Sequence, residues 1–164
     1  GYEESNGFLA GNYVRDKDAV NASMLICEMA AFYRTKGISL IQARENMYKT
    51  YGVYYHTQQS FTFEGKAGME KMNSIMENLR KNYVAEIGGL EGISKNVETG
   101  KITEIKLPKS NVLVFGLTDG AKVIIRPSGT EPKIKAYYTA IGETQSDAQA
   151  LEKKLAESFS KLIN

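Results

Sequence analysis

Residues 123–135 constrain the fold of this chain more than any other segment. The segment begins with a β-branched run typical of a strand, passes through a short loop, and enters a second alternating run at 134–141. Pro127 and Pro132 fix the φ angle on both sides of the loop and stiffen it before any ligand binds. The pattern predicts two strands joined by a loop whose shape is largely set in advance.

This loop carries the groups that bind a phosphate dianion. Arg126 offers a planar fork of donors, and Ser128 and Thr130 offer short hydroxyl donors. Gly129 lets backbone N–H groups come close to a ligand. The same residue types are also common in an ordinary hairpin loop whose charges are solvated. The sequence therefore predicts either a phosphate-binding loop or a solvated hairpin loop.

Two lysines follow the loop, Lys133 and Lys135. Alternation along a strand sends both side chains to the same face, so either lysine could add its charge to a phosphate site. A carboxylate at Glu131 is unexpected beside an anion. We expect this side chain to face away from the site or to pair with a lysine.

The first 51 residues show two helical patterns. A first helix is expected to begin at Asp16 or Asp18, either of which can accept hydrogen bonds from the orphan N–H groups, and to end at Gly37. A second helix opens with a Ser-x-x-Gln capping box at 39–42 and closes near Gly52. Two helices joined so tightly predict the helical tail of an α/β domain.

From residue 52 onward the pattern mixes strands and helices. We expect a strand at 53–63, a helix at 69–79 with methionines in the core, weaker strands between 88 and 105, and a hairpin turn at 118–120. A closing helix is expected to start at a Ser-x-x-Gln capping box at 146–149. Its inner face is expected to consist of Leu151, Leu155, Phe159 and Leu162. Helices on one face of a mainly antiparallel sheet make an α+β sandwich.

Composition argues against several classes of protein. The formal charge is +2 over 164 residues, and dispersed Lys and Arg do not form a nucleic-acid-binding surface. No apolar run approaches the length of a membrane span. Cys27, the only cysteine, lies in a helical apolar pattern, so we expect it to be buried and reduced, as in the cytosol. His56, the only histidine, has no neighbouring His or Cys and is expected to be structural.

Two motifs resemble one known family. Residues 126–133, Arg-Pro-Ser-Gly-Thr-Glu-Pro-Lys, resemble the C-terminal phosphate-binding loop of the α-D-phosphohexomutases, the phosphoglucomutase/phosphomannomutase superfamily. Residues 3–7, Glu-Glu-Ser-Asn-Gly, resemble the sugar-binding loop of that family's third domain, and residues 14–18, Val-Arg-Asp-Lys-Asp, resemble the segment after it. The motifs follow the family's order and together span nearly the whole chain.

The resemblance implies a domain organisation and a site. Residues 52–164 would form a C-terminal domain with a TATA-box-binding-protein-like fold, and residues 1–51 would be the C-terminal part of the third, sugar-binding α/β domain. Glu3 and Ser5 would hydrogen-bond the 3- and 4-hydroxyls of the sugar. Lys17, assisted by Arg15, would reach the sugar or its phosphate. The phosphate would be held by Arg126, Ser128, Gly129, Thr130 and Lys135.

The resemblance also implies an activity for a longer protein. Mutases of this family interconvert hexose 1-phosphate and hexose 6-phosphate through a phosphoserine enzyme and glucose 1,6-bisphosphate or a similar intermediate. Their serine loop and their three-aspartate Mg²⁺ loop have no counterpart here, so no catalytic residue or metal ligand is expected. We therefore expect the C-terminal portion of a cytoplasmic mutase, inactive alone, whose partners are the hexose phosphate and the remaining mutase domains. A stand-alone phospho-ligand-binding regulatory module is the alternative, and the choice between glucose and mannose stays open.

Overall fold

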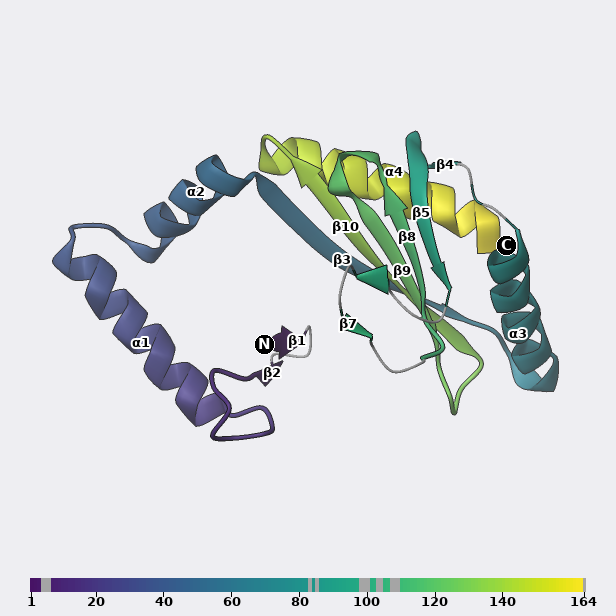
Figure 1. The fold of residues 1–164 in the computed structure, drawn as a ribbon, viewed down its shortest axis with the longest axis horizontal. Helices are drawn as coiled ribbons and strands as arrows, with labels where there is room; N and C mark the ends of the chain where they lie inside the picture. Colours follow the sequence, from purple (N-terminus) through teal and green to yellow (C-terminus); the bar gives the residue numbers. More distant parts are fainter. Residues whose placement is uncertain are drawn as a thin grey trace. The chain divides into compact units, whose positions relative to one another are not determined.

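The chain divides into two compact units. The computed structural model describes residues 1–3, 7–82, 84, 86–97, 101–102, 105–106 and 110–163. An N-terminal unit covers Gly1–Tyr51 and a C-terminal unit covers Gly52–Asn164 (Figure 1). Gly52, with φ +82°, stands between the last helix of the first unit and the first strand of the second. Only glycine adopts this left-handed conformation without strain, so the helix ends there.

The N-terminal unit consists of a two-stranded ribbon and two helices. Its elements are β1 (Tyr2–Glu3), β2 (Gly7–Phe8), α1 (Ala19–Thr35) and α2 (Leu40–Tyr51). The ribbon is antiparallel, and Leu9 N donates to Gly1 O over 2.8 Å to extend it. The N–H of Asp18 donates to Phe8 O at 2.9 Å, which ties the start of α1 to the ribbon.

Side chains and glycine define the helix ends as the sequence indicates. Asp18, and not Asp16, caps α1, because its carboxylate accepts from the N–H groups of Val20 and Asn21 at 2.9 and 3.1 Å. Gly37 ends α1 with φ +67°. The capping box at the start of α2 is confirmed, since Ser39 N donates to Gln42 Oε1 and Gln42 N donates to Ser39 Oγ.

The apolar stripe of α1 is exposed in this unit. Neither α1 nor α2 contains a buried residue, and Val20 is 81% exposed. Cys27 is exposed as well, so the prediction that it is buried is wrong. The helical spacing identified the apolar face correctly, but a short ribbon and one neighbouring helix do not supply a layer that covers it.

The C-terminal unit is built around a six-stranded antiparallel sheet. The order of the strands across the sheet is β3-β10-β9-β8-β5-β4, and every pairing is antiparallel. The unit contains β3 (Val53–Thr62), α3 (Gly65–Lys81), β4 (Glu86–Ile87), β5 (Leu90–Val97), β6 (Lys101–Ile102), β7 (Ile105–Lys106), β8 (Leu113–Leu117), η1 (Thr118–Gly120), β9 (Lys122–Pro127), β10 (Lys133–Gly142) and α4 (Gln145–Ile163). The predicted strand at 53–63 and the final strand are confirmed.

The predicted hairpin between β8 and β9 is confirmed. Asp119 and Gly120 have φ values of 58° and 75°. Leu117 N donates to Ala121 O at 3.0 Å and closes the turn. Two consecutive left-handed residues match the twist of a tight hairpin, which explains why an Asp-Gly pair stands there.

Both long helices of this unit cover one face of the sheet, so the α+β class is confirmed. The α3 side chains Met72, Met76 and Leu79 are buried, as the methionine pattern predicts. Phe159 of α4 is fully buried, and its ring packs against the rings of Phe61, Phe115 and Tyr138. Figure 1 shows α4 running across the strands. Neither helix packs on the opposite face of the sheet, which is called the open face.

Two details of α4 differ from the sequence prediction. The helix begins at Gln145, and its capping box is formed by Thr144 and Asp147, not by the Ser-x-x-Gln at 146–149. Leu162 is 40% exposed, and Ile163 is buried in its place. Ile163 follows Phe159 at a spacing of four residues, which continues the buried row one turn further.

Candidate functional site

The register of three strands brings Arg126 beside Lys135. Arg126 on β9 is the cross-strand partner of Lys135 on β10, and Lys135 is in turn the partner of Ser60 on β3. Ile125 and Ala136 are fully buried on the helix-covered face. Because side chains alternate along a strand, Arg126, Lys135 and Ser60 project from the open face. Directly opposed side chains have Cβ atoms about 5 Å apart, so one anion can reach both cations.

Hydrogen bonds within the loop at 128–132, next to these cations, fix its backbone. Ser128 N donates to Lys133 O at 2.8 Å, and Lys133 N donates to Glu131 O at 2.8 Å. The N–H groups of Thr130 and Glu131 both donate to Ser128 Oγ, at 3.3 and 3.2 Å. Since a hydroxyl oxygen has two lone pairs, these bonds leave the hydroxyl hydrogen of Ser128 to donate elsewhere.

The far end of the loop is tied to the start of α3. Phe63 N donates to Pro132 O at 2.8 Å. The Phe63 ring in turn lies 5.4 Å from the ammonium of Lys71 on α3. The loop is therefore held at both ends, by β9 and β10 at one and by the junction of β3 and α3 at the other. A loop ordered in this way loses little conformational entropy when it binds a ligand.

Several donors next to the loop have no partner among the described residues. The guanidinium of Arg126 is exposed and makes no ion pair or hydrogen bond with any described residue. The N–H of Gly129 makes no hydrogen bond with a described residue either. Lys133 differs, because its Nζ lies 3.5 Å from Glu131 Oε2. A phosphate placed over the open face could accept from Arg126, from the Gly129 N–H and from the Ser128 hydroxyl. Lys135 would add its charge from the adjacent strand.

The second set of predicted residues, Glu3, Ser5 and Lys17, belongs to the N-terminal unit. Glu3 lies on β1 opposite Gly7, and its side chain and the whole of Ser5 lie outside the described structure. Lys17 immediately precedes Asp18, whose N–H bonds to Phe8, so its segment adjoins the ribbon. The Lys17 ammonium is half-exposed and lies 4.0 Å from Asp16 Oδ1. The ribbon and Lys17 are thus brought together within this unit.

A mainly apolar groove also lies in the N-terminal unit. This groove of about 460 Å³ lies between the ribbon and α1 and is lined by Phe8, Leu9, Ile26 and Met29, among others. Lys17 is not among the described residues that line it. The groove offers mainly apolar contacts, so it is no candidate for sugar hydroxyls.

His56 and Ser60 also lie on the open face of the sheet. His56 Nδ1 lies 3.1 Å from Thr139 Oγ1 on the adjacent strand. Within the described residues, no three His, Cys, Asp or Glu side chains are grouped to hold a metal ion. Sequence reasoning did not identify Ser60, because its position beside Lys135 depends on pairing between strands that are far apart in sequence.

More than half of the chain matches the model of a known protein family. Residues 72–158 match the model of the phosphoglucomutase/phosphomannomutase C-terminal domain. The chain belongs to this family. The match includes Arg126, the 128–132 loop and Lys135, and the expected superfamily is therefore confirmed.

The match to individual relatives covers most of this chain but only a limited part of each relative. A phosphoglucomutase from Staphylococcus epidermidis is 40% identical over 148 residues, which are 85% of this chain and 27% of that protein. One from Staphylococcus aureus is 42% identical over 147 residues, 84% of this chain and 26% of that protein. The chain thus spans about a quarter of the length of these curated relatives.

A solved structure shares the fold. The exocytosis-sensitive phosphoprotein pp63/parafusin, a phosphoglucomutase from Paramecium in its open form, matches with a TM-score of 0.63 at 18% identity. The match covers 98% of this chain and 29% of that chain.

Within the described residues, no helix has the length and apolar character needed to cross a lipid bilayer.

Proposed function

We propose that this chain is the C-terminal portion of a phosphohexomutase that interconverts hexose 1-phosphate and hexose 6-phosphate, with glucose as the leading substrate. Family membership and the phosphoglucomutase relatives support the reaction class. They favour it over a stand-alone regulatory module. In the proposed mechanism a phosphoserine elsewhere in the enzyme phosphorylates the substrate, and the bisphosphorylated sugar reorients and returns its other phosphate to the serine.

The two units would serve different parts of this reaction. Residues 1–51 would belong to the third, sugar-binding domain, and residues 52–164 would form the phosphate-binding domain. The exposed apolar stripe of α1 supports the first assignment, because a helix with such a face normally packs against further structure. In this unit Glu3 and Ser5 would bind the sugar hydroxyls, and Lys17 would bind the sugar or its phosphate.

One observation carries the proposal for the C-terminal unit: two cations, Arg126 and Lys135, lie opposite each other on adjacent strands, next to the ordered 128–132 loop. Arg126, Lys135 and the loop donors Ser128, Gly129 and Thr130 would hold the phosphate that is not reacting. Phosphoryl transfer depends largely on positioning and charge stabilisation. Binding energy gained at the remote phosphate can therefore lower the barrier at the reacting one.

The chemical step itself would take place outside this chain. The described residues offer no cluster of three metal-binding side chains, so no step is assigned to Mg²⁺ here. We infer that Mg²⁺ and the reactive serine are supplied by the remaining mutase domains and that glucose 1,6-bisphosphate is the intermediate. The proposed location is the cytoplasm, where sugar phosphates are metabolised.

Arg126→Ala in the full-length enzyme tests this proposal. Loss of a charge-assisted hydrogen bond to phosphate costs about 1.5–3 kcal/mol, or roughly tenfold to a hundredfold in kcat/KM. The loss should occur with both 1-phosphate and 6-phosphate substrates, because reorientation presents each phosphate to the site in turn. Arg126→Lys should recover only part of it, since an ammonium lacks the planar fork.

Lys122→Ala provides a matched control. Lys122 is exposed on the same strand and the same face, about 13 Å away at four residues' distance. Its loss removes one positive charge but no proposed contact, so kcat/KM should stay within about twofold. Equal kcat/KM values for Arg126→Ala and the native enzyme in both directions would refute the phosphate-site assignment.

A further inference from the structure

Glu131 places a carboxylate inside the loop that is proposed to bind a phosphate. Its N–H donates to Ser128 Oγ at 3.2 Å, and its C=O accepts from Lys133 N at 2.8 Å. The backbone of Glu131 is therefore part of the ordered loop and cannot swing away from it. Its side chain is 64% exposed. An uncompensated charge at this position would repel an incoming phosphate.

Lys133 compensates this charge. Its Nζ lies 3.5 Å from Glu131 Oε2, and its side chain is only 29% exposed, which is low for a lysine. Lys133 begins β10, and its C=O accepts the bond from Ser128 that closes the loop. Its ammonium is thus engaged by a carboxylate at the loop itself. Arg126, in contrast, has no partner among the described residues.

We propose that Lys133 is not a phosphate ligand, and that the Glu131–Lys133 ion pair sets the anion affinity of the 128–132 loop by cancelling two opposite charges. The inference rests on the proposed function, in which Lys135, the cross-strand partner of Arg126, acts on the phosphate. It gives Lys133 a separate role, which is to balance the charge of Glu131. A loop of moderate affinity suits a reaction whose bisphosphorylated intermediate must leave the site, reorient and bind again, since binding that is equally tight in all states does not accelerate the reaction.

The ion pair predicts opposite changes in phosphate affinity for two substitutions, and it predicts that the changes cancel when both are made. A direct contact between Lys133 and the phosphate does not predict this cancellation. Glu131→Gln removes a repulsive charge, so it should tighten phosphate binding. Lys133→Gln leaves the carboxylate uncompensated, so it should weaken binding. At about 7 Å, the reach of two extended residues, one unit charge in water changes affinity by about threefold for each charge on the phosphate. The double substitution should restore the native affinity.

The experiment measures the competitive inhibition constant of inorganic phosphate against the full-length enzyme. Glu131→Gln should lower it by about threefold to sevenfold, Lys133→Gln should raise it by a similar factor, and the double variant should lie within about twofold of the native value. Thermal melts of the variants should stay close to that of the native enzyme, because a partly exposed ion pair contributes at most about 1 kcal/mol to stability.

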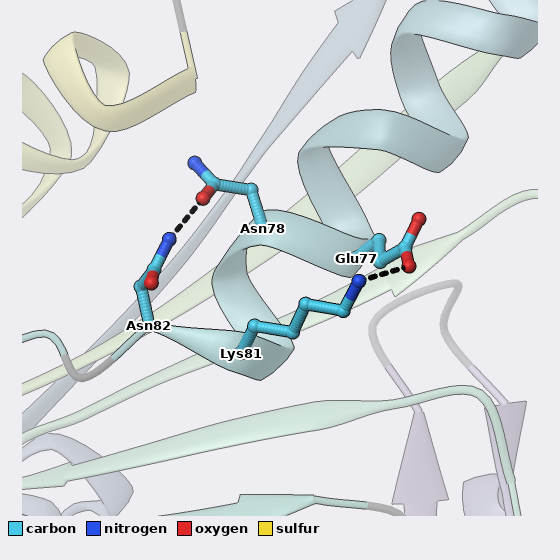
Figure 2. A network of polar contacts seen from close by, with 4 residues as sticks. All are labelled: Glu77, Asn78, Lys81 and Asn82. Atoms are coloured by element: carbon cyan, nitrogen blue, oxygen red, sulfur yellow. Dashed lines mark hydrogen bonds and ion pairs between the residues drawn. The ribbon is translucent and has the colours of Figure 1, made fainter.

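A second ion pair serves as a matched control. Figure 2 shows Glu77 and Lys81 on α3, whose side chains meet at 2.6 Å and are 63% and 70% exposed. The hydrogen bond and the charge of Lys81 lower the pKa of the Glu77 carboxyl, as expected for a formed ion pair. The same substitutions there, Glu77→Gln and Lys81→Gln, should leave the inhibition constant within about twofold of native.

Three results would overturn the inference. Weaker phosphate binding in Lys133→Gln that persists in the double variant would identify Lys133 as a direct ligand. Unchanged or weaker binding in Glu131→Gln would show that the carboxylate does not repel the phosphate. If Arg126→Ala weakens phosphate binding while Glu131→Gln fails to tighten it, only the inference about the ion pair is wrong. If Arg126→Ala leaves phosphate binding unchanged, both the proposed phosphate site and this inference are wrong.

Discussion

At the residue scale, Ser128 and Glu131 show how a short loop can be ordered and charge-balanced from within. One hydroxyl oxygen accepts two backbone N–H groups, and one ion pair cancels a carboxylate beside a predicted anion site. The residue types of Arg126, Ser128 and Gly129 were evident from the sequence, because they follow one another along the chain. The choice between Lys133 and Lys135 was not, because it depends on which side chain meets Glu131 in space.

Tyr138 gives a residue-scale prediction that does not depend on the proposed function. Its hydroxyl donates to Gln59 Oε1 at 3.2 Å, and burial, together with the negative charge of Glu152, raises the pKa of its phenol above the usual value. Because the folded-state pKa is the higher one, Tyr138 contributes stability below about pH 10 that is lost as the pH rises further.

Tyr138→Phe should therefore change stability in a pH-dependent way. At pH 7 the loss of the hydrogen bond should cost about 1 kcal/mol. Above about pH 10 the native protein should lose stability more steeply than the variant, because the variant has no phenol to ionise at this position. Urea unfolding at pH 7 and at several values above 10 measures both effects. Parallel alkaline losses in the two proteins would contradict the role given to Tyr138.

At the element scale, local patterns predicted the helices and strands better than their exact ends. The capping box of Ser39 and Gln42 and the Asp119-Gly120 turn are encoded by neighbouring residues, and both form as expected. The start of α4 was misplaced because Thr144 and Asp147 offer the same chemistry two residues earlier. The pairing of β10 with β3, which places Ser60 beside Lys135, carries no local signal.

Helix α4 provides a matched pair of substitutions. Phe159 is fully buried among three aromatic rings, so Phe159→Ala should lower the free energy of unfolding by about 3–5 kcal/mol. Leu162 is 40% exposed on the same helix, and Leu162→Ala should cost less than about 1 kcal/mol. Chemical denaturation of both variants gives the comparison. Equal losses would mean that α4 packs on the sheet through a different face.

At the scale of the whole molecule, the two units differ in how far they bury their own apolar residues. The C-terminal unit has a continuous core between the sheet and both helices, whereas α1 and α2 contain no buried residue. Helical spacing in the sequence showed that α1 has an apolar face, but it could not show what covers that face. For this reason the burial of Cys27 was predicted wrongly while the helix itself was predicted correctly.

The most direct test of the phosphate site is an amide NMR titration of the 164-residue chain with glucose 6-phosphate. The amide signals of Gly129 and Thr130 should shift together in a saturable manner, because their N–H groups lie in the proposed site. Signals of Gly88 and Gly89, which lie between β4 and β5, should stay in place. The Arg126→Ala chain should require a roughly tenfold or higher ligand concentration for the same shifts. Saturable shifts confined to other segments, or identical curves for the Arg126→Ala chain, would contradict the account.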